Sequence, residues 1–265
     1  MRIVSQLGAW ILDGLAYFMA LGKIAGRAAY YTFLGPFRGK PLRVQSTISQ
    51  AMEVGVGAFP ILSLITACIG LILAFESAPQ LARFGALKYV ANTVALSMSK
   101  ELGPLITAIV VIGRSGSAFA AEIGTMRVTE EIDALETMAI RPVHFLVAPK
   151  FLAMILMLPC LTIWADTMGI LGGALFGVLK ADFTFLRYIQ ASVDALVWRD
   201  IVSGLIKSVI FGITITAVGC LEGMSTGLGP EQVGRSTTRA VVRSILLVVI
   251  FDLLYTGVSF GLGIA

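Results

Sequence analysis

The chain has 265 residues, of which 57% are hydrophobic and only 14% are charged, and its mean hydropathy is +0.89. So few charges could not cover a soluble domain of this size, a disordered chain would be rich in charge, and three Cys exclude a disulfide scaffold. The composition therefore indicates an integral membrane protein with several spans, in which the formal charge of +4 reflects membrane orientation rather than nucleic-acid binding.

Residues 1–53 predict an amphipathic helix followed by a basic and aromatic juxtamembrane segment. The apolar positions of the helix recur at helical spacing: Ile3, Leu7, Trp10, Leu15, Phe18 and Leu21. A cleaved signal peptide is the alternative, but Asp13 interrupts the apolar stretch, so we interpret an uncleaved helix in the membrane interface. Aromatic and basic side chains that suit the headgroup layer follow, among them Phe37, Arg38 and Lys40.

Residues 54–265 contain five stretches apolar enough for transmembrane helices, and no alternating β-barrel pattern. These stretches are 54–75, 89–113, 145–179, 201–221 and 241–263. The third would measure about 50 Å as a helix, against about 30 Å for a hydrocarbon core. We interpret it as one span with an interfacial extension, broken at Pro159, with two short spans as the alternative. The predicted fold is all-α, with an interfacial helix followed by five transmembrane helices.

Basic residues are distributed unequally between alternate connecting segments. The N-terminal segment and the loops at 114–150 and 222–243 hold 13 of the 20 Lys and Arg, and the segments on the other side hold five. Because cytoplasmic segments are rich in Lys and Arg, the N-terminus is predicted to be cytoplasmic and the C-terminus to face outward. If residues 145–179 formed two spans, the predicted membrane orientation of every later segment would be inverted.

The predicted cytoplasmic loop 113–144 departs from this basic pattern, because it holds five acids against three Arg. Its apolar residues recur at helical spacing in two sets, which predicts two short helices with a break near Gly124. One interpretation is a solvated connector. The other is a docking element for a soluble partner, favoured because a connector needs only a few residues.

Two motifs here resemble the MlaE (YrbE) permease family. They are KELGP at Lys100–Pro104 and GRSGSAFAAEIGTMRVTEEIDALETMAIRP at Gly113–Pro142, and the resemblance extends from about residue 45 to the end. It implies a homodimeric permease of an ABC lipid transporter in the bacterial inner membrane. Implied partners are two copies of a soluble ATPase that binds ATP-Mg, an accessory subunit on it, and an MCE-domain oligomer on the outer side. The family often has Arg where this chain has Lys100 and Lys150, so the positive charge is kept but a bidentate contact is not.

The resemblance also implies roles for individual residues. The loop between spans two and three would carry the coupling helix, so the ATPase contact is assigned to Glu122, Gly124, Arg127, Glu130, Glu131 and Asp133. The pocket for phospholipid or a related lipid is assigned to Leu71, Phe75, Glu76, Gln80 and Glu101.

Five ionisable residues fall inside the predicted spans, where charge is costly and marks functional candidates: Lys100, Glu101, Asp166, Lys207 and Asp252. Glu101 precedes Gly103-Pro104, which loosens the helix. It either belongs to an adjacent Lys100–Glu101 pair near this bend that other spans satisfy, or it lies at the lipid pocket of the dimer. Lys207 and Asp252 are predicted to pair if their helices are neighbours, as a structural or a functional ion pair. Asp166 is interpreted as reaching the interface.

Motifs for chemistry within the chain are lacking. No phosphate-binding G-x-x-x-x-G-K-[ST] loop occurs, and His144 has no neighbouring Cys or second His, so neither a nucleotide site nor a metal site is predicted. The chain is thus expected to be a transport subunit without its own ATPase and without a cofactor. The alternative is an ion-coupled secondary transporter that uses Glu101, Lys207 and Asp252, although no internal repeats support it. An intramembrane enzyme would need a nucleophile–base pair, and none is evident.

Overall fold

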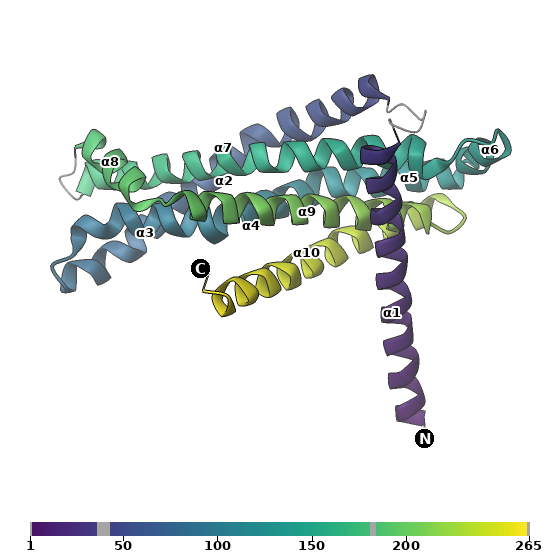
Figure 1. Cartoon of the computed structure of the whole chain (residues 1–265), viewed down its shortest axis with the longest axis horizontal. Coiled ribbons are helices and arrows are strands. Elements are labelled where there is room, and N and C mark those ends of the chain that lie inside the picture. Colours follow the sequence, from purple (N-terminus) through teal and green to yellow (C-terminus); the bar gives the residue numbers. More distant parts are fainter. Residues whose placement is uncertain (1, 36–42, 181–183, 264–265) are drawn as a thin grey trace. The chain divides into compact units, whose positions relative to one another are not determined.

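The computed structural model describes residues 2–35, 43–180 and 184–263. Within these ranges the chain is helical, with no strand (Figure 1). The α-helices are α1 (Arg2–Ala29), α2 (Val44–Arg83), α3 (Val90–Ser97), α4 (Gly103–Val111), α5 (Ser117–Val128), α6 (Glu131–Thr137), α7 (Ala148–Lys180), α8 (Phe185–Ala195), α9 (Trp198–Met224) and α10 (Pro230–Gly261). The expected anchors Phe37, Arg38 and Lys40 lie outside the described residues, as do the side chains of Ile3, Leu7 and Trp10.

Short turns of other helical types join several of these helices. They are η1 (Tyr30–Leu34), η3 (Leu87–Tyr89), η4 (Met98–Leu102), η5 (Ile112–Gly116) and η6 (Val143–Val147). All except the 3₁₀ turn η3 are π-helical. In η4 the Gly103 N–H donates to the Met98 carbonyl, five residues back. Pro104 next to it has no N–H to donate, which explains the wider turn at this point.

Five helical segments are long and apolar enough to cross a membrane: Val44–Arg83, Leu87–Val128, Val143–Leu179, Trp198–Met224 and Pro230–Gly261. The prediction of an all-α membrane protein with five spans is therefore confirmed. The third segment contains one continuous helix, α7, so the single-span interpretation holds and the predicted break at Pro159 is wrong. A helix inside a membrane tolerates proline when neighbouring groups satisfy the freed carbonyl.

Two compact units alternate along the chain. The first comprises residues 1–50, 115–153 and 213–244, and the second comprises 51–114, 154–212 and 245–265. Helices α2, α7, α9 and α10 each contribute a part to both units. Each unit is considered separately below.

Glycines allow the backbones of the second unit to approach closely. A Cβ on Gly70 of α2 would lie 1.8 Å from the Gly169 carbonyl oxygen of α7, and one on Gly172 would lie 2.0 Å from the Ala67 oxygen. Farther along α7, Gly173 makes room for the buried Tyr188 of α8. Burial raises the pKa of the Tyr188 hydroxyl, so this group stays neutral. Such small-residue contacts are typical of helix packing in a bilayer.

Candidate functional site: a lysine between two carboxylates, and the acidic α5–α6 segment

Lys207 of α9 is the centre of a polar cluster in the second unit. Its side chain is only 2% exposed, yet its ammonium meets three polar partners. The Nζ lies 2.5 Å from Glu101 Oε2 and 3.0 Å from Asp252 Oδ1, and it donates to Thr256 Oγ1 at 2.9 Å. The ring of Tyr255 also lies 5.6 Å from the ammonium. A buried lysine is thus held by two acids, a hydroxyl and an aromatic face, which offsets the cost of removing its charge from water.

Glu101 reaches this cluster from the π turn η4. One of its carboxylate oxygens binds Lys207, and the other accepts a hydrogen bond from the Thr256 hydroxyl at 3.1 Å. The side chain nevertheless remains 41% exposed, in contrast to the buried lysine. With both acids ionised, the group of Glu101, Asp252 and Lys207 carries one excess negative charge. The half-exposed carboxylate can therefore bind a cation or the amine of a ligand.

A second ion pair lies beside the first. Lys100 Nζ is 3.1 Å from Asp200 Oδ1, so the neighbours Lys100 and Glu101 bind different partners rather than each other. Asp200 also accepts from the Val197 N–H at the start of α9. Both ion pairs, together with Arg199 and several hydroxyls, line a cavity of about 50 Å³. The adjacent residues Lys100 and Glu101 are therefore each neutralised by a residue of α9.

Sequence reasoning brought Lys207 and Asp252 together but missed other members of the cluster. Thr256 follows Asp252 by one helical turn in α10, so helical spacing could have placed it on the same face. Asp200 carried no comparable signal, because it lies at the predicted membrane boundary, where an acid is ordinary.

The other candidate lipid-binding residues lie along α2. Leu71 and Leu102, the residue after Glu101, both pack against the same apolar cluster. Phe75 is 51% exposed, and its ring centroid lies 4.9 Å from that of Phe176. Glu76 and Gln80 are exposed. Within the described residues, no hydrogen bond or ion pair joins these α2 side chains to Glu101.

Asp166 is partly exposed, and the expectation that it reaches the membrane interface stays a prediction. One of its carboxylate oxygens is buried and has no hydrogen-bond partner among the described residues. This oxygen packs against Gly103, where an added Cβ would lie only 1.7 Å away. Trp164, the expected interfacial neighbour, donates to the Ser63 hydroxyl at 2.7 Å.

Helices α5 and α6 form the acidic segment, which belongs to the first unit (Figure 1). The predicted break near Gly124 is wrong, because Gly124 lies inside α5. It packs against the connection that follows α9, where a Cβ would lie 2.9 Å from the Thr226 hydroxyl. The actual break follows Val128, and Glu130 adopts a left-handed conformation with φ of 61°. Glycine here serves close packing rather than chain reversal.

The six predicted coupling residues have different environments. Glu122 is half-exposed and lies 2.6 Å from Nζ of Lys150, whose side chain is buried. Lys150 also donates to Gln50 at 3.1 Å and lies over the Phe119 ring. Arg127 binds Asp133 at 2.5 Å and so connects α5 to α6.

The remaining acids of the segment face outward. Glu130, Glu131 and Asp133 are all exposed. Underneath them, Ile132 and Leu135 are buried and fix α6 against the unit. The segment is therefore an ordered element whose outer face is acidic and whose inner face is packed.

Arg141 and His144, which follow α6 in the first unit, both contact Tyr31. The Arg141 guanidinium donates to the Tyr31 hydroxyl at 2.7 Å, and this hydrogen bond raises the pKa of Arg141. His144 packs its ring against Tyr31, 5.0 Å between centroids. In the described part of the chain, no group of three or more His, Cys, Asp or Glu side chains is placed to hold a metal.

The fold and these two polar sites define a helical, multi-span membrane protein with a packed acidic loop element. Comparison with known proteins gives the family. The sequence model described as Permease MlaE matches residues 47–258. The chain belongs to the MlaE permease family.

Named relatives extend this assignment. The chain is 34% identical over 266 residues to the intermembrane phospholipid transport system permease protein MlaE of Haemophilus influenzae, covering 99% of both chains. It is 40% identical over 220 residues to a probable ABC transporter permease protein of Rickettsia prowazekii, covering 83% of this chain and 85% of the relative. It is also 35% identical over 216 residues to the chloroplast protein TRIGALACTOSYLDIACYLGLYCEROL 1 of Arabidopsis thaliana, covering 82% and 62%.

Proposed function

We propose that this chain is the permease subunit of an ATP-driven ABC transporter that moves phospholipid or a related lipid between the inner membrane and an MCE-domain partner. The observation that carries the proposal is the match to a phospholipid transport permease over 99% of both chains. ATP-Mg would be bound and hydrolysed by a separate ATPase, present in two copies on a homodimer of this chain and carrying an accessory subunit. The chain itself would transport without catalysing a reaction.

The α5–α6 segment is the proposed contact for the ATPase. Exposed Glu130, Glu131 and Asp133 offer a negative face to a basic groove. Movement of the ATPase would be transmitted inward through the ion pair of Glu122 with the buried Lys150 and through the close contact of Gly124 with Thr226. An ordered, tightly packed segment supports this role better than a solvated connector does.

The lipid site is proposed at Glu101 and the exposed part of α2. The half-exposed carboxylate of Glu101, with its excess negative charge, would meet the polar headgroup, and Leu71 and Phe75 would meet the acyl chains. Glu76 and Gln80 would lie at the headgroup end of the same path. Lys207 and Asp252 would hold Glu101 in place and keep its charge available.

The orientation is a proposal that rests on the distribution of Lys and Arg. The N-terminus, the α5–α6 segment and the start of α10 would be cytoplasmic, and the C-terminus periplasmic. The α1 helix, with exposed Leu15 and Phe18, would lie in the interface.

Charge reversal on α6 tests the proposed coupling. Glu130→Lys with Glu131→Lys should abolish copurification of the ATPase while leaving insertion and folding intact, because both side chains are exposed. The matched control is Asp194→Lys with Glu231→Lys, two exposed acids outside the segment, and it should retain the ATPase. Persistent association in the α6 variant would refute the assignment. Lipid transport by the purified chain down an ion gradient, without any ATPase, would favour the secondary-transporter alternative.

A further inference from the structure

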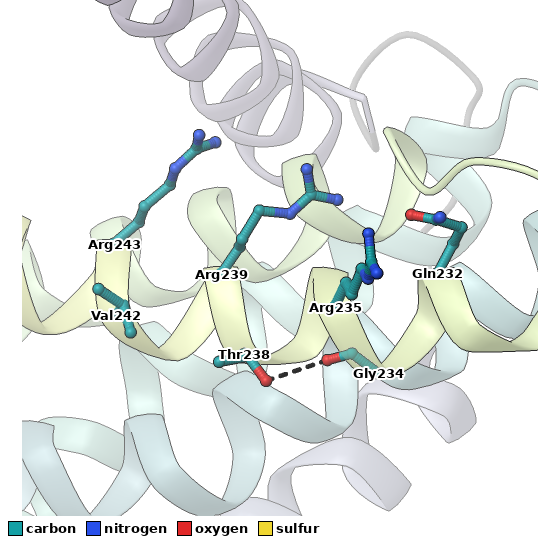
Figure 2. A pocket seen from close by; sticks show the side chains of 7 residues that line it. All are labelled: Gln232, Gly234, Arg235, Thr238, Arg239, Val242 and Arg243. Carbon is teal, nitrogen blue, oxygen red and sulfur yellow. Dashed lines mark hydrogen bonds between the residues drawn. The ribbon is translucent and has the colours of Figure 1, made fainter.

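Three arginines on one face of α10 line a groove of about 620 Å³ in the first unit (Figure 2). Arg235, Arg239 and Arg243 follow one another at intervals of four residues, and their side chains extend to the same side of the helix. Gln232, Gly234, Thr238 and Val242 complete the lining. Consecutive arginines are about 6 Å apart along the helix axis, since each residue adds about 1.5 Å.

A buried carboxylate beneath the groove orients two of these arginines. Glu222 of α9 has a side chain only 3% exposed, and it binds Arg243 directly and lies 3.6 Å from Nε of Arg239. The Arg243 guanidinium also lies 4.5 Å from the ring centroid of Tyr17 in α1. Burial and the nearby Glu222 raise the pKa of Tyr17, so its hydroxyl stays neutral and adds no negative charge.

The arginines keep much of their binding capacity despite these contacts. Side chains of Arg239 and Arg243 remain 47% and 45% exposed, and that of Arg235 is 66% exposed. The partner of Arg235 is Glu231, itself 78% exposed, and such a surface ion pair is worth little and exchanges readily. A guanidinium has five N–H donors, so two fixed arginines can still donate to an anion.

The length of α10 indicates the depth of the groove in a bilayer. Its 32 residues span about 48 Å, whereas a hydrocarbon core is about 30 Å thick. The apolar part of the helix starts after Ser244, so Arg243 lies at the edge of the core and Arg239 about one turn farther out. The headgroup layer is only about 5–8 Å thick on each side, which places these two arginines at the level of the phosphates.

We propose that this groove binds the phosphodiester of an anionic glycerophospholipid from the leaflet at the N-terminal end of α10. Two arginines fixed by Glu222 supply the donors, Arg235 adds positive charge, and exposed Val242 lies on the side where an acyl chain begins. A membrane lipid matches this groove because the arginines lie at headgroup depth and the apolar part of α10 follows them. This site lies in the first unit and differs from the Glu101 cluster of the second unit.

The test compares lipid retention in two double variants. Arg235→Gln with Arg239→Gln removes two charges but leaves Arg243 to bind the buried Glu222, so the fold is preserved. The control, Arg83→Gln with Arg187→Gln, removes two exposed charges elsewhere. Each protein is reconstituted in nanodiscs of phosphatidylglycerol mixed with phosphatidylcholine, and the lipids that stay bound after release are counted by native mass spectrometry.

The parent chain and the control should retain phosphatidylglycerol over phosphatidylcholine, and the groove variant should lose that preference by about thirtyfold, the effect of two arginines near an anionic surface. Arg235→Lys with Arg239→Lys keeps the charge but loses the planar set of donors, so its preference for phosphatidylglycerol should lie between those of the parent and the groove variant.

Equal retention in the parent and the groove variant, or an equal loss in the control, would overturn the proposal. So would displacement of phosphatidylglycerol by inorganic phosphate, which would make the ligand a soluble anion. Loss of ATPase copurification in the groove variant with unchanged lipid retention would assign the arginines to a protein contact instead.

Discussion

Two buried lysines, one in each unit, have similar exposure but differ in the charge of their partners. Lys150 and Lys207 each have side chains no more than 3% exposed. Lys150 binds one carboxylate, that of Glu122, and the neutral amide of Gln50, so its ion pair is balanced. Lys207 binds two carboxylates and is over-compensated. A balanced pair has little left to bind, whereas an over-compensated one retains an acid that a ligand can use.

The half-exposed acid that binds each buried lysine also lies in a different setting in the two units. In the first unit, half-exposed Glu122 belongs to α5 and connects this helix to buried Lys150 of α7. In the second unit, half-exposed Glu101 and buried Lys207 both line a small polar cavity. We infer that Lys150 chiefly connects α5 to α7. Lys207 chiefly holds the carboxylate of Glu101 in place for a ligand. The variants below test this division.

Lys207→Met should have the largest effect on stability. It leaves Glu101 and Asp252 facing each other without a cation, and removal of one partner of a buried pair costs about 3–5 kcal/mol. The measurement is unfolding by sodium dodecyl sulfate in mixed micelles, followed by circular dichroism. Addition of Asp252→Asn to this variant should restore part of the loss, because it removes one of the two opposed charges. If the double variant is no more stable than Lys207→Met, carboxylate repulsion is not the cause.

Glu122→Gln should rank second, at about 2 kcal/mol of destabilisation. The ammonium of Lys150 then lies buried with only amide oxygens and the Phe119 ring to stabilise it. The same unfolding experiment measures the effect. A loss as large as that of Lys207→Met would mean that the charge balance of the two clusters does not differ as described.

Lys150→Met should cost less than Glu122→Gln, about 1 kcal/mol. Removal of this lysine leaves Glu122, which is half-exposed and can be hydrated, and methionine fills the space of the lysine stem. In the first unit, therefore, loss of the acid should harm stability more than loss of the lysine, the reverse of the order in the second unit. An equal or larger cost for Lys150→Met than for Glu122→Gln would contradict this asymmetry.

Membrane spans were predictable from the sequence because long apolar runs leave few alternatives in a bilayer. The pairing of Lys207 with Asp252 was predictable for a related reason, since an isolated charge inside a span is costly. Addition of Glu101 to that pair was not, because the π turn at Met98–Leu102 changes the direction of its side chain relative to regular helical spacing.

Errors in the acidic segment have similar physical causes. Gly124 suggested a break, but tertiary packing against Thr226 requires a small residue there, and the chain turns instead at Glu130, a residue with no strong turn preference. The assignment of Glu122 to the ATPase contact stays a prediction, and no feature of the sequence indicated that Lys150 binds this residue within the chain. Lys150 precedes an apolar stretch, so its burial became evident only from the packing around it. Long-range contacts of this kind have no local sequence signal.

The smallest stability effect should come from neutralising one acid of the over-compensated cluster. Glu101→Gln or Asp252→Asn leaves Lys207 with one carboxylate, so either change should alter stability by less than about 1 kcal/mol. Both variants should insert and fold normally. Under the proposed function, Glu101→Gln should nevertheless abolish lipid transport, measured in vesicles with the ATPase present, because the excess charge is gone.

The double variant, Glu101→Gln with Asp252→Asn, tests the comparison most directly. It leaves Lys207 without a counterion, so its cost should greatly exceed the sum of the two single changes, a coupling expected only where two acids share one cation. Additive costs would show that each carboxylate is stabilised independently of the lysine. In that case the cluster of Glu101, Lys207 and Asp252 would have no more capacity to bind a ligand than the balanced pair of Glu122 and Lys150.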